Sequence, residues 1–387
     1  MVLKVGSRGN IPPFMVMEVM RAAALRERDG RAVHHLEVGQ PGTGAPRGVI
    51  DAAHAALDSD RIGYTVALGI PALREAISGH YATHYGCDVP AERIVVTTGS
   101  SGGFILSFLA AFDPGDRVAL AAPGYPCYRH ILNALDIVPV SLPAGPKDRY
   151  QPTPALLDEA LSQGPIDGLI VASPSNPTGT MLAPDAFDTL RRYCADAGIR
   201  MISDEIYHGI TFGTAESTAA SHDPSAVVVN SFSKYFSMTG WRLGWLVVPE
   251  DLLRAVESLA QNLFISPPTL SQFAAVAAFD CHEELRANVR NYAVNRQRLT
   301  DALPKAGMSD LAPSDGAFYL YADVGNLTND SQAFCARILE ETGVAITPGV
   351  DFDAERGHRT VRISYAESTD VVAAGTDALT TWLTANT

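Results

Sequence analysis

Short apolar runs alternate with longer amphipathic segments through the middle of the chain. Six of the runs each fit a β-strand that is buried on both faces, at residues 93–99, 117–121, 137–142, 168–172, 200–203 and 226–230. Four segments between them predict helices, at residues 104–112, 128–135, 154–163 and 184–197. Strands that alternate with helices in this way predict a mostly parallel sheet covered by helices on both faces.

The pattern changes after residue 248, where the amphipathic segments become longer. Three of these segments predict helices, at residues 251–262, 270–280 and 283–303. The chain then alternates again, and the expected elements are strands at 317–322, 344–347 and 360–365 and helices at 331–342 and 371–385. The last third of the chain therefore predicts a smaller α/β unit, with the long helix as a bridge to it.

The first part of the chain carries fewer regular signals. An amphipathic helix is expected at 11–26, entered through two prolines, and a short strand at 36–38 leads into a loop rich in glycine and proline. Further helices are expected at 47–57 and from Pro71 onward, because proline is favoured in the first turn of a helix.

The predicted fold class is α/β, with a three-layer large domain built on a mostly parallel sheet and a smaller α/β C-terminal domain. The expected boundaries give an N-terminal segment at 1–45 that packs on the small domain. The large domain is expected at 46–285 and the small C-terminal domain at 286–387.

Composition narrows the classes of function. The chain has 387 residues, of which 47% are hydrophobic and 19% charged, as is ordinary for a water-soluble globular enzyme. Its 43 acidic and 29 basic residues give a formal net charge of -14, which disfavours polyanionic partners such as nucleic acids and anionic membranes. No apolar run reaches the ~20 residues of a membrane span, and no signal peptide is evident, so we expect a cytoplasmic protein.

Cysteine spacing argues against metal and disulfide chemistry. The five cysteines lie far apart, without the paired spacing of a zinc ribbon or a disulfide framework. Cys127 and His130 form a single C-x-x-H pair that lacks two further ligands. We therefore expect reduced thiols and no metal site.

The candidate catalytic and binding residues lie where the predicted strands end. Ligands of parallel sheets bind at the carboxyl ends of the strands. The polar or aromatic residues at these ends are Ser100, Ser101, Tyr125, Asn176, Asp204, Tyr207, Ser231 and Lys234. Lys234 lies in the stretch SFSKYFSMTGWRLGW (231–245), between two apolar runs and shortly before Arg242.

Each of these residues has an ordinary structural explanation when taken singly. Most lysines lie on the surface, and Asn176 with Pro177 forms a common turn dipeptide. Asp204 beside Glu205 would suit a solvated acidic pair, and Arg242 would suit a surface ion pair of small energetic value. Their occurrence at successive strand ends instead favours one shared ligand.

A pyridoxal cofactor would use the whole set. The amine of Lys234 can form an imine with the cofactor's aldehyde, and Asp204 can keep the ring nitrogen protonated. Asn176 and Tyr207 can donate to the phenolic oxygen, and Tyr125 offers a flat surface to the ring. The phosphate would take hydroxyls, backbone N–H groups and a cation from two segments, with Ser100, Ser101, Gly102, Ser231, Ser233 and Arg242 as the candidates.

The chain resembles a fold-type I, pyridoxal-phosphate-dependent enzyme of the class I/II aminotransferase family over essentially its whole length. The motifs that carry the resemblance are GYTVALGIPALREAI, TTGSSGG, DPGD, PGYP, SNPTGT, SDEIYHGI, SFSKYFSMTGWRLGW and VRISYA. Their order and spacing are highly specific, the Ser-x-Ser-Lys with its trailing arginine most of all.

The resemblance implies roles for individual residues. Lys234 would be the Schiff-base lysine and then the base that moves a proton from the substrate's α-carbon, with Asp204 and Tyr207 assisting catalysis. Arg362 would bind the substrate carboxylate bidentately, helped by Asn176 and by the backbone of Gly39. Tyr64 would come from the partner subunit to touch the phosphate, which implies a homodimer with shared active sites.

The resemblance also implies transamination between an amino acid and a 2-oxo acid. A pyridoxal-dependent C–S lyase and an aspartate aminotransferase are the alternatives, and a non-catalytic ligand-binding relative is the alternative from another class. An aspartate enzyme needs a second cation for the distal carboxylate, and none can be placed. The helix after TTGSSGG carries Phe104, Ile105, Leu106, Phe108 and Leu109.

The residues expected near the substrate's side chain are apolar. Ile11 and Phe14 are the candidates from the N-terminal segment, and Met15, Phe264 and Ile265 lie in stretches that could join them. Packing of the N-terminal segment explains these residues equally well. They favour a neutral aliphatic or aromatic amino acid as the substrate.

Overall fold

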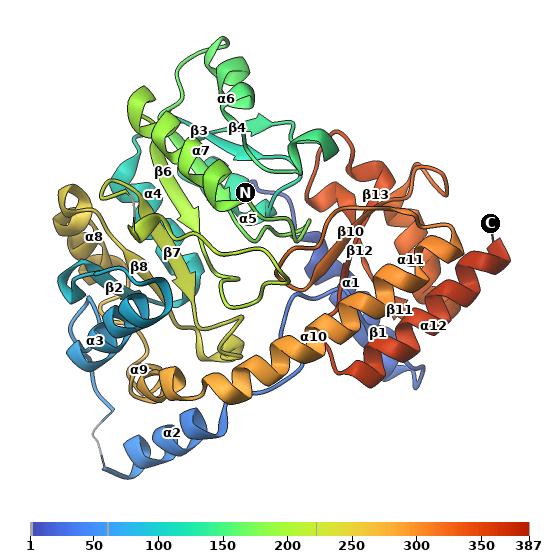
Figure 1. The fold of residues 1–387 in the computed structure, drawn as a ribbon, viewed down its shortest axis with the longest axis horizontal. Coiled ribbons are helices and arrows are strands. Elements are labelled where there is room, and N and C mark those ends of the chain that lie inside the picture. The colour runs from blue at the N-terminus through green and yellow to red at the C-terminus, as the bar shows by residue number, and fades with distance from the viewer. Residues whose placement is uncertain (1–2, 60–61, 222, 387) are drawn as a thin grey trace.

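The structure is a computed structural model that describes residues 3–59, 62–221 and 223–386. A seven-stranded sheet with the order β2-β8-β7-β6-β5-β3-β4 forms the centre of its larger part (Figure 1). The strand bounds are Ile94–Thr97 (β2), Arg117–Ala121 (β3), Val138–Leu142 (β4), Gly168–Ala172 (β5), Arg200–Asp204 (β6), Val227–Ser231 (β7) and Gly244–Val247 (β8). Strands β3 to β7 are parallel, and β8 is antiparallel to both of its neighbours. The predicted mostly parallel sheet is confirmed.

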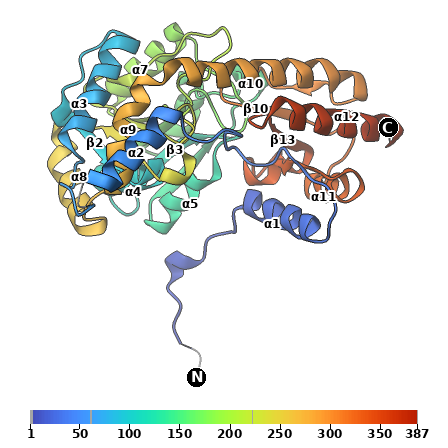
Figure 2. The same cartoon turned by 90° about the horizontal axis from the view of Figure 1, so that it is seen from below.

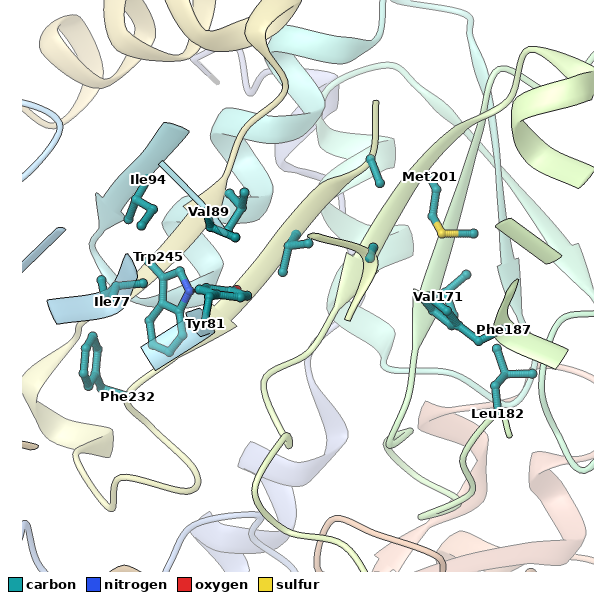
Figure 3. Packing of buried hydrophobic residues seen from close by; sticks show 14 of the residues in the cluster. Ile77, Tyr81, Val89, Ile94, Val171, Leu182, Phe187, Met201, Phe232 and Trp245 are labelled. Carbon is teal, nitrogen blue, oxygen red and sulfur yellow. The ribbon is translucent and has the colours of Figure 1, made fainter. Parts of the chain in front are cut away.

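Helices cover both faces of this sheet, because successive strand residues point to opposite sides. Val95 belongs to the cluster that packs with α4 (Gly99–Ala111), α5 (Pro126–Ala134) and α8 (Glu250–Leu263). Val96 belongs to the cluster on the other face, with α2 (Arg47–Ser59), α3 (Pro71–His80), α6 (Pro154–Leu161), α7 (Pro184–Ala197) and α9 (Thr269–Val276). Figure 3 shows part of this second cluster, where the Trp245 side chain lies beside Tyr81 and Ile77.

A smaller antiparallel sheet forms the other part of the molecule, on the right of Figure 1. Its strand order is β12-β13-β10-β9, with bounds Asp310–Leu311 (β9), Tyr319–Asp323 (β10), Thr347–Pro348 (β12) and Thr360–Ser364 (β13). The helices of this part are α1 (Met15–Arg28), α10 (His282–Ala302), α11 (Ser331–Thr342) and α12 (Thr369–Asn386). Helix α10 reaches across from the first part and packs against α12 (Figure 2).

The N-terminal segment joins this smaller part. Strand β1 (His34–His35) pairs in parallel with β11 (Val344–Ala345), although the two lie about 300 residues apart in the sequence. The described segment before α1 runs beside α5, where Arg8 pairs with Asp136, and its N-terminal end projects from the rest of the molecule (Figure 2). Within the described ranges, no helix combines the length and the apolar character that a membrane crossing requires.

Several predicted elements differ from the structure; the strand predicted at 344–347, for example, is split into β11 and β12, which belong to different sheets. Helix α4 begins at Gly99 and not at residue 104, so residues 100–103 already belong to the helix. Helix α1 begins at Met15 and not at residue 11, because two prolines keep the preceding segment extended. The strand predicted at 36–38 lies at 34–35. After it, the backbone of Leu36 bonds to two different strands and the Glu37 carbonyl accepts from side chains, so the ladder ends.

Candidate active site

A cavity of about 200 Å³ lies where the two parts of the molecule meet. The carboxyl ends of the parallel strands, the start of α4, the segment around α1 and the small sheet all contribute to its walls. Most of the predicted site residues line it, namely Phe14, Gly39, Ser100, Ser101, Tyr125, Asn176, Tyr207, Ser233, Lys234, Arg242 and Arg362. The remaining predicted residues, Ile11, Tyr64, Gly102, Asp204 and Ser231, do not.

Lys234 projects into this cavity from the turn after β7. Its Nζ donates to the backbone oxygen of Gly39 at 2.6 Å. Burial, together with the nearby guanidinium groups of Arg362 and Arg242, lowers the pKa of Lys234 to about 8. With this pKa, Lys234 has a far larger neutral fraction near physiological pH than an ordinary lysine, and only the neutral amine can act as a nucleophile or a base.

Asp204 ends β6 as a buried carboxylate. Its Oδ1 accepts from the backbone N–H of Ile206 at 3.1 Å, and its Oδ2 accepts from the hydroxyl of Tyr128. Burial raises the pKa of Asp204 to about 6. Tyr128 itself lines the cavity, and sequence reasoning missed it. Its only signal was its place three residues after Tyr125, on the same face of a helix.

Tyr207 forms a second buried pair with a tyrosine that the sequence analysis did not identify. The hydroxyls of Tyr207 and Tyr319 lie 2.8 Å apart, and both rings line the cavity. Gly39 is required beside them, because a Cβ at that position would lie 1.6 Å from the Tyr319 hydroxyl oxygen. The glycine therefore permits close packing of the N-terminal loop on β10.

Arg362 on β13 is fixed on several sides. Its Nη1 donates to Oδ1 of Asn176 at 2.8 Å, and its Nη2 donates to the backbone oxygen of Glu37. The guanidinium lies between two aromatic rings, with its carbon 4.5 Å from the Tyr319 centroid and 4.8 Å from the Phe352 centroid. Its buried Nε has no hydrogen-bond partner among the described residues. The side chain is therefore an oriented cation that can take an anionic ligand.

A second cationic region lies at the start of α4. Free backbone N–H groups at a helix N-terminus favour an anion, and the hydroxyls of Ser100 and Ser101 lie in that first turn. Arg242 adopts a left-handed backbone conformation, with φ 52°, and donates from Nη1 to the backbone oxygen of Thr239 at 3.0 Å. A Cβ on Gly99 would lie 2.5 Å from Nη2 of Arg242, so a glycine there admits the guanidinium.

The predicted residues that do not line the cavity have other surroundings. Ser231 is buried and donates from Oγ to the Ser233 hydroxyl at 2.9 Å, so it supports a cavity-lining residue. Gly102 is buried within α4. Ile11 is 46% exposed and Tyr64 is 84% exposed. The structure therefore does not bring Ile11 to the substrate side of the cavity or Tyr64 into the cavity of its own chain.

The wall on the side of α1 and α5 is largely apolar. Phe14 packs edge-on against Tyr125, with ring centroids 6.0 Å apart. The neighbouring lining residues, which the sequence analysis did not assign, are Val16, Met17, Val38, Phe104, Cys127 and Ile131. In the described part of the chain, no group of three or more His, Cys, Asp and Glu residues could hold a metal ion.

These observations fit pyridoxal phosphate. The cavity holds a lysine with a lowered pKa and a serine-rich helix start beside an arginine. The buried carboxylate of Asp204 lies behind the wall, bonded to the hydroxyl of the cavity-lining Tyr128. A separate arginine with an unpartnered buried Nε can take a second anion, such as a substrate carboxylate. The two anion-binding regions and the amine between them match a phosphorylated aldehyde and an amino acid bound together.

The sequence is similar to those of known aminotransferases along almost its whole length. The profile of the family described as aminotransferase class I and II matches residues 32–374. The valine–pyruvate aminotransferase of Mycobacterium tuberculosis is 50% identical over 384 residues, which cover 98% of each chain. The aspartate/prephenate aminotransferase of Thermus thermophilus is 32% identical over 361 residues, which cover 92% of each chain.

The fold is also similar to that of a solved structure along almost the whole chain. The crystal structure of an aminotransferase from Mycobacterium tuberculosis superimposes with a TM-score of 0.97 and 49% sequence identity. The match covers 99% of this chain and 100% of the other. The resemblance inferred from the motifs is thereby confirmed.

Proposed function

The chain belongs to the class I and II aminotransferase family, whose members depend on pyridoxal phosphate, and we propose which of its residues carry out the transfer and on which substrates. The enzyme moves an amino group between an amino acid and a 2-oxo acid. When bound, pyridoxal phosphate supplies an electron-accepting ring that stabilises negative charge at the substrate's α-carbon.

Lys234 is the proposed catalytic base. Its amine would hold the cofactor covalently between turnovers. It would take a proton from the α-carbon of the amino acid in one half-reaction and deliver a proton to the α-carbon of the 2-oxo acid in the other. The lowered pKa of Lys234, caused by burial and by two neighbouring arginines, supports this role because a base must be unprotonated. Asp204 holds the proton on the cofactor's ring nitrogen, and Asn176 with Tyr207 donates to the phenolic oxygen.

The remaining residues orient the two ligands. Tyr125 packs on the cofactor ring, and the phosphate is held by the N-terminal turn of α4 and by the 231–242 segment, through Ser100, Ser101, Gly102, Ser231, Ser233 and Arg242. Arg362 takes the substrate carboxylate, supported by Asn176 and the Gly39 backbone. The fixed guanidinium with its unpartnered Nε supports this assignment.

The proposed substrate is a neutral, aliphatic L-amino acid. This proposal rests on one observation. Every cationic side chain that lines the cavity already has a proposed role, either in holding the cofactor or in binding the substrate's α-carboxylate. Lys234, Arg242 and Arg362 are the only cationic residues among the described ones that line it, and the wall near Phe14 and Ile131 is apolar. A distal carboxylate would find no partner there. The name of the valine–pyruvate relative agrees, and pyruvate is the proposed acceptor.

A donor panel tests this substrate class. With pyruvate or 2-oxoglutarate as acceptor, kcat/KM for valine should exceed kcat/KM for aspartate by at least about tenfold, since an unpaired buried carboxylate costs more than ~1.4 kcal/mol. Measuring oxo-acid against ammonia release in the same reactions distinguishes transamination from C–S lyase chemistry. Equal or better rates with aspartate would contradict the proposal.

We also propose a homodimer in which Tyr64 of each copy reaches the phosphate site of the other. The high exposure of Tyr64, between exposed Ile62 and Val66, supports a surface that a second copy covers. Sedimentation equilibrium measures the assembly directly. The division into 1–45, 46–285 and 286–387 and a cytoplasmic location remain part of the proposal; the five free cysteines agree with a reducing compartment.

A further inference from the structure

A buried histidine connects two of the turns that carry site residues. His208 directly follows Tyr207, and its side chain is 3% exposed. Its Nε2 lies 3.0 Å from the backbone oxygen of Ser173. Because a carbonyl oxygen only accepts, Nε2 carries a proton and donates it. Ser173 begins the turn that leads to Asn176, so this bond joins that turn to the turn of Asp204 and Tyr207.

The other ring nitrogen of His208 faces one hydroxyl and two carboxylates. Nδ1 lies 2.7 Å from the hydroxyl of Tyr85, which ends a π-helical turn (Tyr81–Tyr85). It also lies 3.6 Å from Oε2 of Glu205 and 3.8 Å from Oε2 of Glu216. Oε2 of Glu205 accepts no hydrogen bond from the described residues, and the imidazole of His208 is the ionisable group that faces it.

The two carboxylates are held in different ways. Burial raises the pKa of Glu205, although His208 acts against this shift. The pKa of Glu216 is lowered, because its ion pairs with His208 and His84 outweigh the effect of burial. Oε1 of Glu216 also accepts from the backbone N–H of Gly209 at 2.6 Å, immediately after His208. The Glu216 carboxylate therefore fixes the backbone directly after the imidazole, whereas Oε1 of Glu205 accepts from the backbone N–H of Ala219 at 2.8 Å.

The same segment also contacts the turn that carries Lys234. Gly209 has φ 87°, and a Cβ there would lie 2.5 Å from the ring of Tyr235, the residue after Lys234. The Tyr235 hydroxyl in turn lies 3.0 Å from Nδ1 of His282, on the long helix α10. Residues 207–209 thus lie in contact with both neighbouring turns of the site.

We propose that His208 is a positioning residue for the cofactor, and that its Nε2 bond to Ser173 sets the separation of Asn176 and Tyr207. These two side chains donate to one cofactor oxygen in the proposed function, on which this inference rests. A small shift of either turn would lengthen one of the two hydrogen bonds. His208 acts without touching the ligand, since it does not line the cavity.

Two amide substitutions separate the roles of the ring nitrogens. Glutamine reaches about as far as Nε2 and can still donate to Ser173, whereas asparagine reaches only as far as Nδ1. His208→Gln should therefore keep the cofactor dissociation constant within about twofold of wild type. His208→Asn should raise it about tenfold, which corresponds to the loss of one hydrogen bond. Fluorescence titration of the cofactor-free protein measures both constants without any turnover.

A second readout reports on the cofactor's electronic state. The midpoint of the pH-dependent absorbance change of the bound cofactor should move in His208→Asn and stay in place in His208→Gln. Tyr85→Phe removes the partner of Nδ1 and leaves the Ser173 bond, so it should behave like wild type in both measurements. This milder variant keeps the test decisive if a His208 variant does not fold.

The measurements distinguish failure of the His208 inference from failure of the proposed function. If the glutamine and asparagine variants bind cofactor equally well or equally poorly, or if Tyr85→Phe weakens binding about tenfold, His208 does not act through Ser173 and the inference is wrong. Failure of the proposed function would instead appear in the wild type, as a protein that binds no cofactor at Lys234.

Discussion

Replacing Arg362 by alanine tests the substrate-carboxylate role most directly. The guanidinium would contribute two charge-assisted hydrogen bonds to the carboxylate, worth about 1.5–3 kcal/mol each. At ~1.36 kcal/mol for each factor of ten, their loss predicts a fall in kcat/KM for valine of about two to four orders of magnitude. The fall should lie mainly in KM if the carboxylate is bound equally in the ground and transition states.

The variant also removes contacts within the protein, and the assay must separate the two effects. Asn176 Oδ1 would lose its buried donor, which costs stability of about 1–3 kcal/mol, whereas the Glu37 backbone oxygen would keep the Thr347 hydroxyl as a donor. Isobutylamine carries the side chain of valine without its carboxylate. A purely structural defect would lower the reactivity of both amines equally, whereas loss of carboxylate binding lowers the reactivity of valine alone.

The ratio of the rate with valine to the rate with isobutylamine distinguishes loss of carboxylate binding from a structural defect. In Arg362→Ala the preference for valine over isobutylamine should collapse, and in Arg362→Lys it should be partly retained, because lysine keeps the charge without the bidentate fork. The preference should therefore rank wild type above lysine above alanine. If Arg362→Ala keeps the wild-type ratio, the substrate carboxylate binds elsewhere and the assignment is wrong.

Two further predictions concern Lys234 and Gly39. Lys234→Ala should abolish turnover. In the cofactor-free wild type the rate of pyridoxal phosphate capture should rise with pH with a midpoint near 8, because burial and Arg362 lower the pKa of Lys234 and only the neutral amine reacts. A midpoint near 10.5 would contradict the assignment. Gly39→Ala places a methyl group 1.6 Å from the Tyr319 hydroxyl and should lower the free energy of unfolding by about 1–3 kcal/mol, as measured by denaturant titration. Gly44→Ala, with nothing within 4 Å of the new methyl group, should change it by less than about 0.5 kcal/mol; equal effects would refute this reasoning.

The sequence alone indicated that the catalytic and binding residues would lie at the ends of the parallel strands. The strands at 117–121 and 168–172 and the helices at 184–197 and 331–342 have the bounds that their hydrophobic patterns predicted. Strand burial is a local property of the residue pattern, and a parallel sheet places all its strand ends on one edge. The position of Lys234 in the cavity therefore followed from local patterns.

The tertiary structure alone decided which side chains meet. The Tyr128 hydroxyl on Asp204 and the Tyr319 hydroxyl on Tyr207 had no signal in the spacing of residues. The start predicted for the helix at 104–112 was wrong, because residues 100–103 already belong to the helix that begins at Gly99, against which Arg242 packs.

One physical reason explains why the sequence could not predict the contacts between elements. Periodicity reports which face of an element is buried, but not which residue of another element lies against it. Asn176 and Arg362 meet across 186 positions, and Gly39 must be a glycine because of a tyrosine on the small sheet. The elements and the reactive lysine were determined by the chain locally, whereas the orientation of Arg362 and the bond between His208 and Ser173 depend on how the two sheets and their turns pack together.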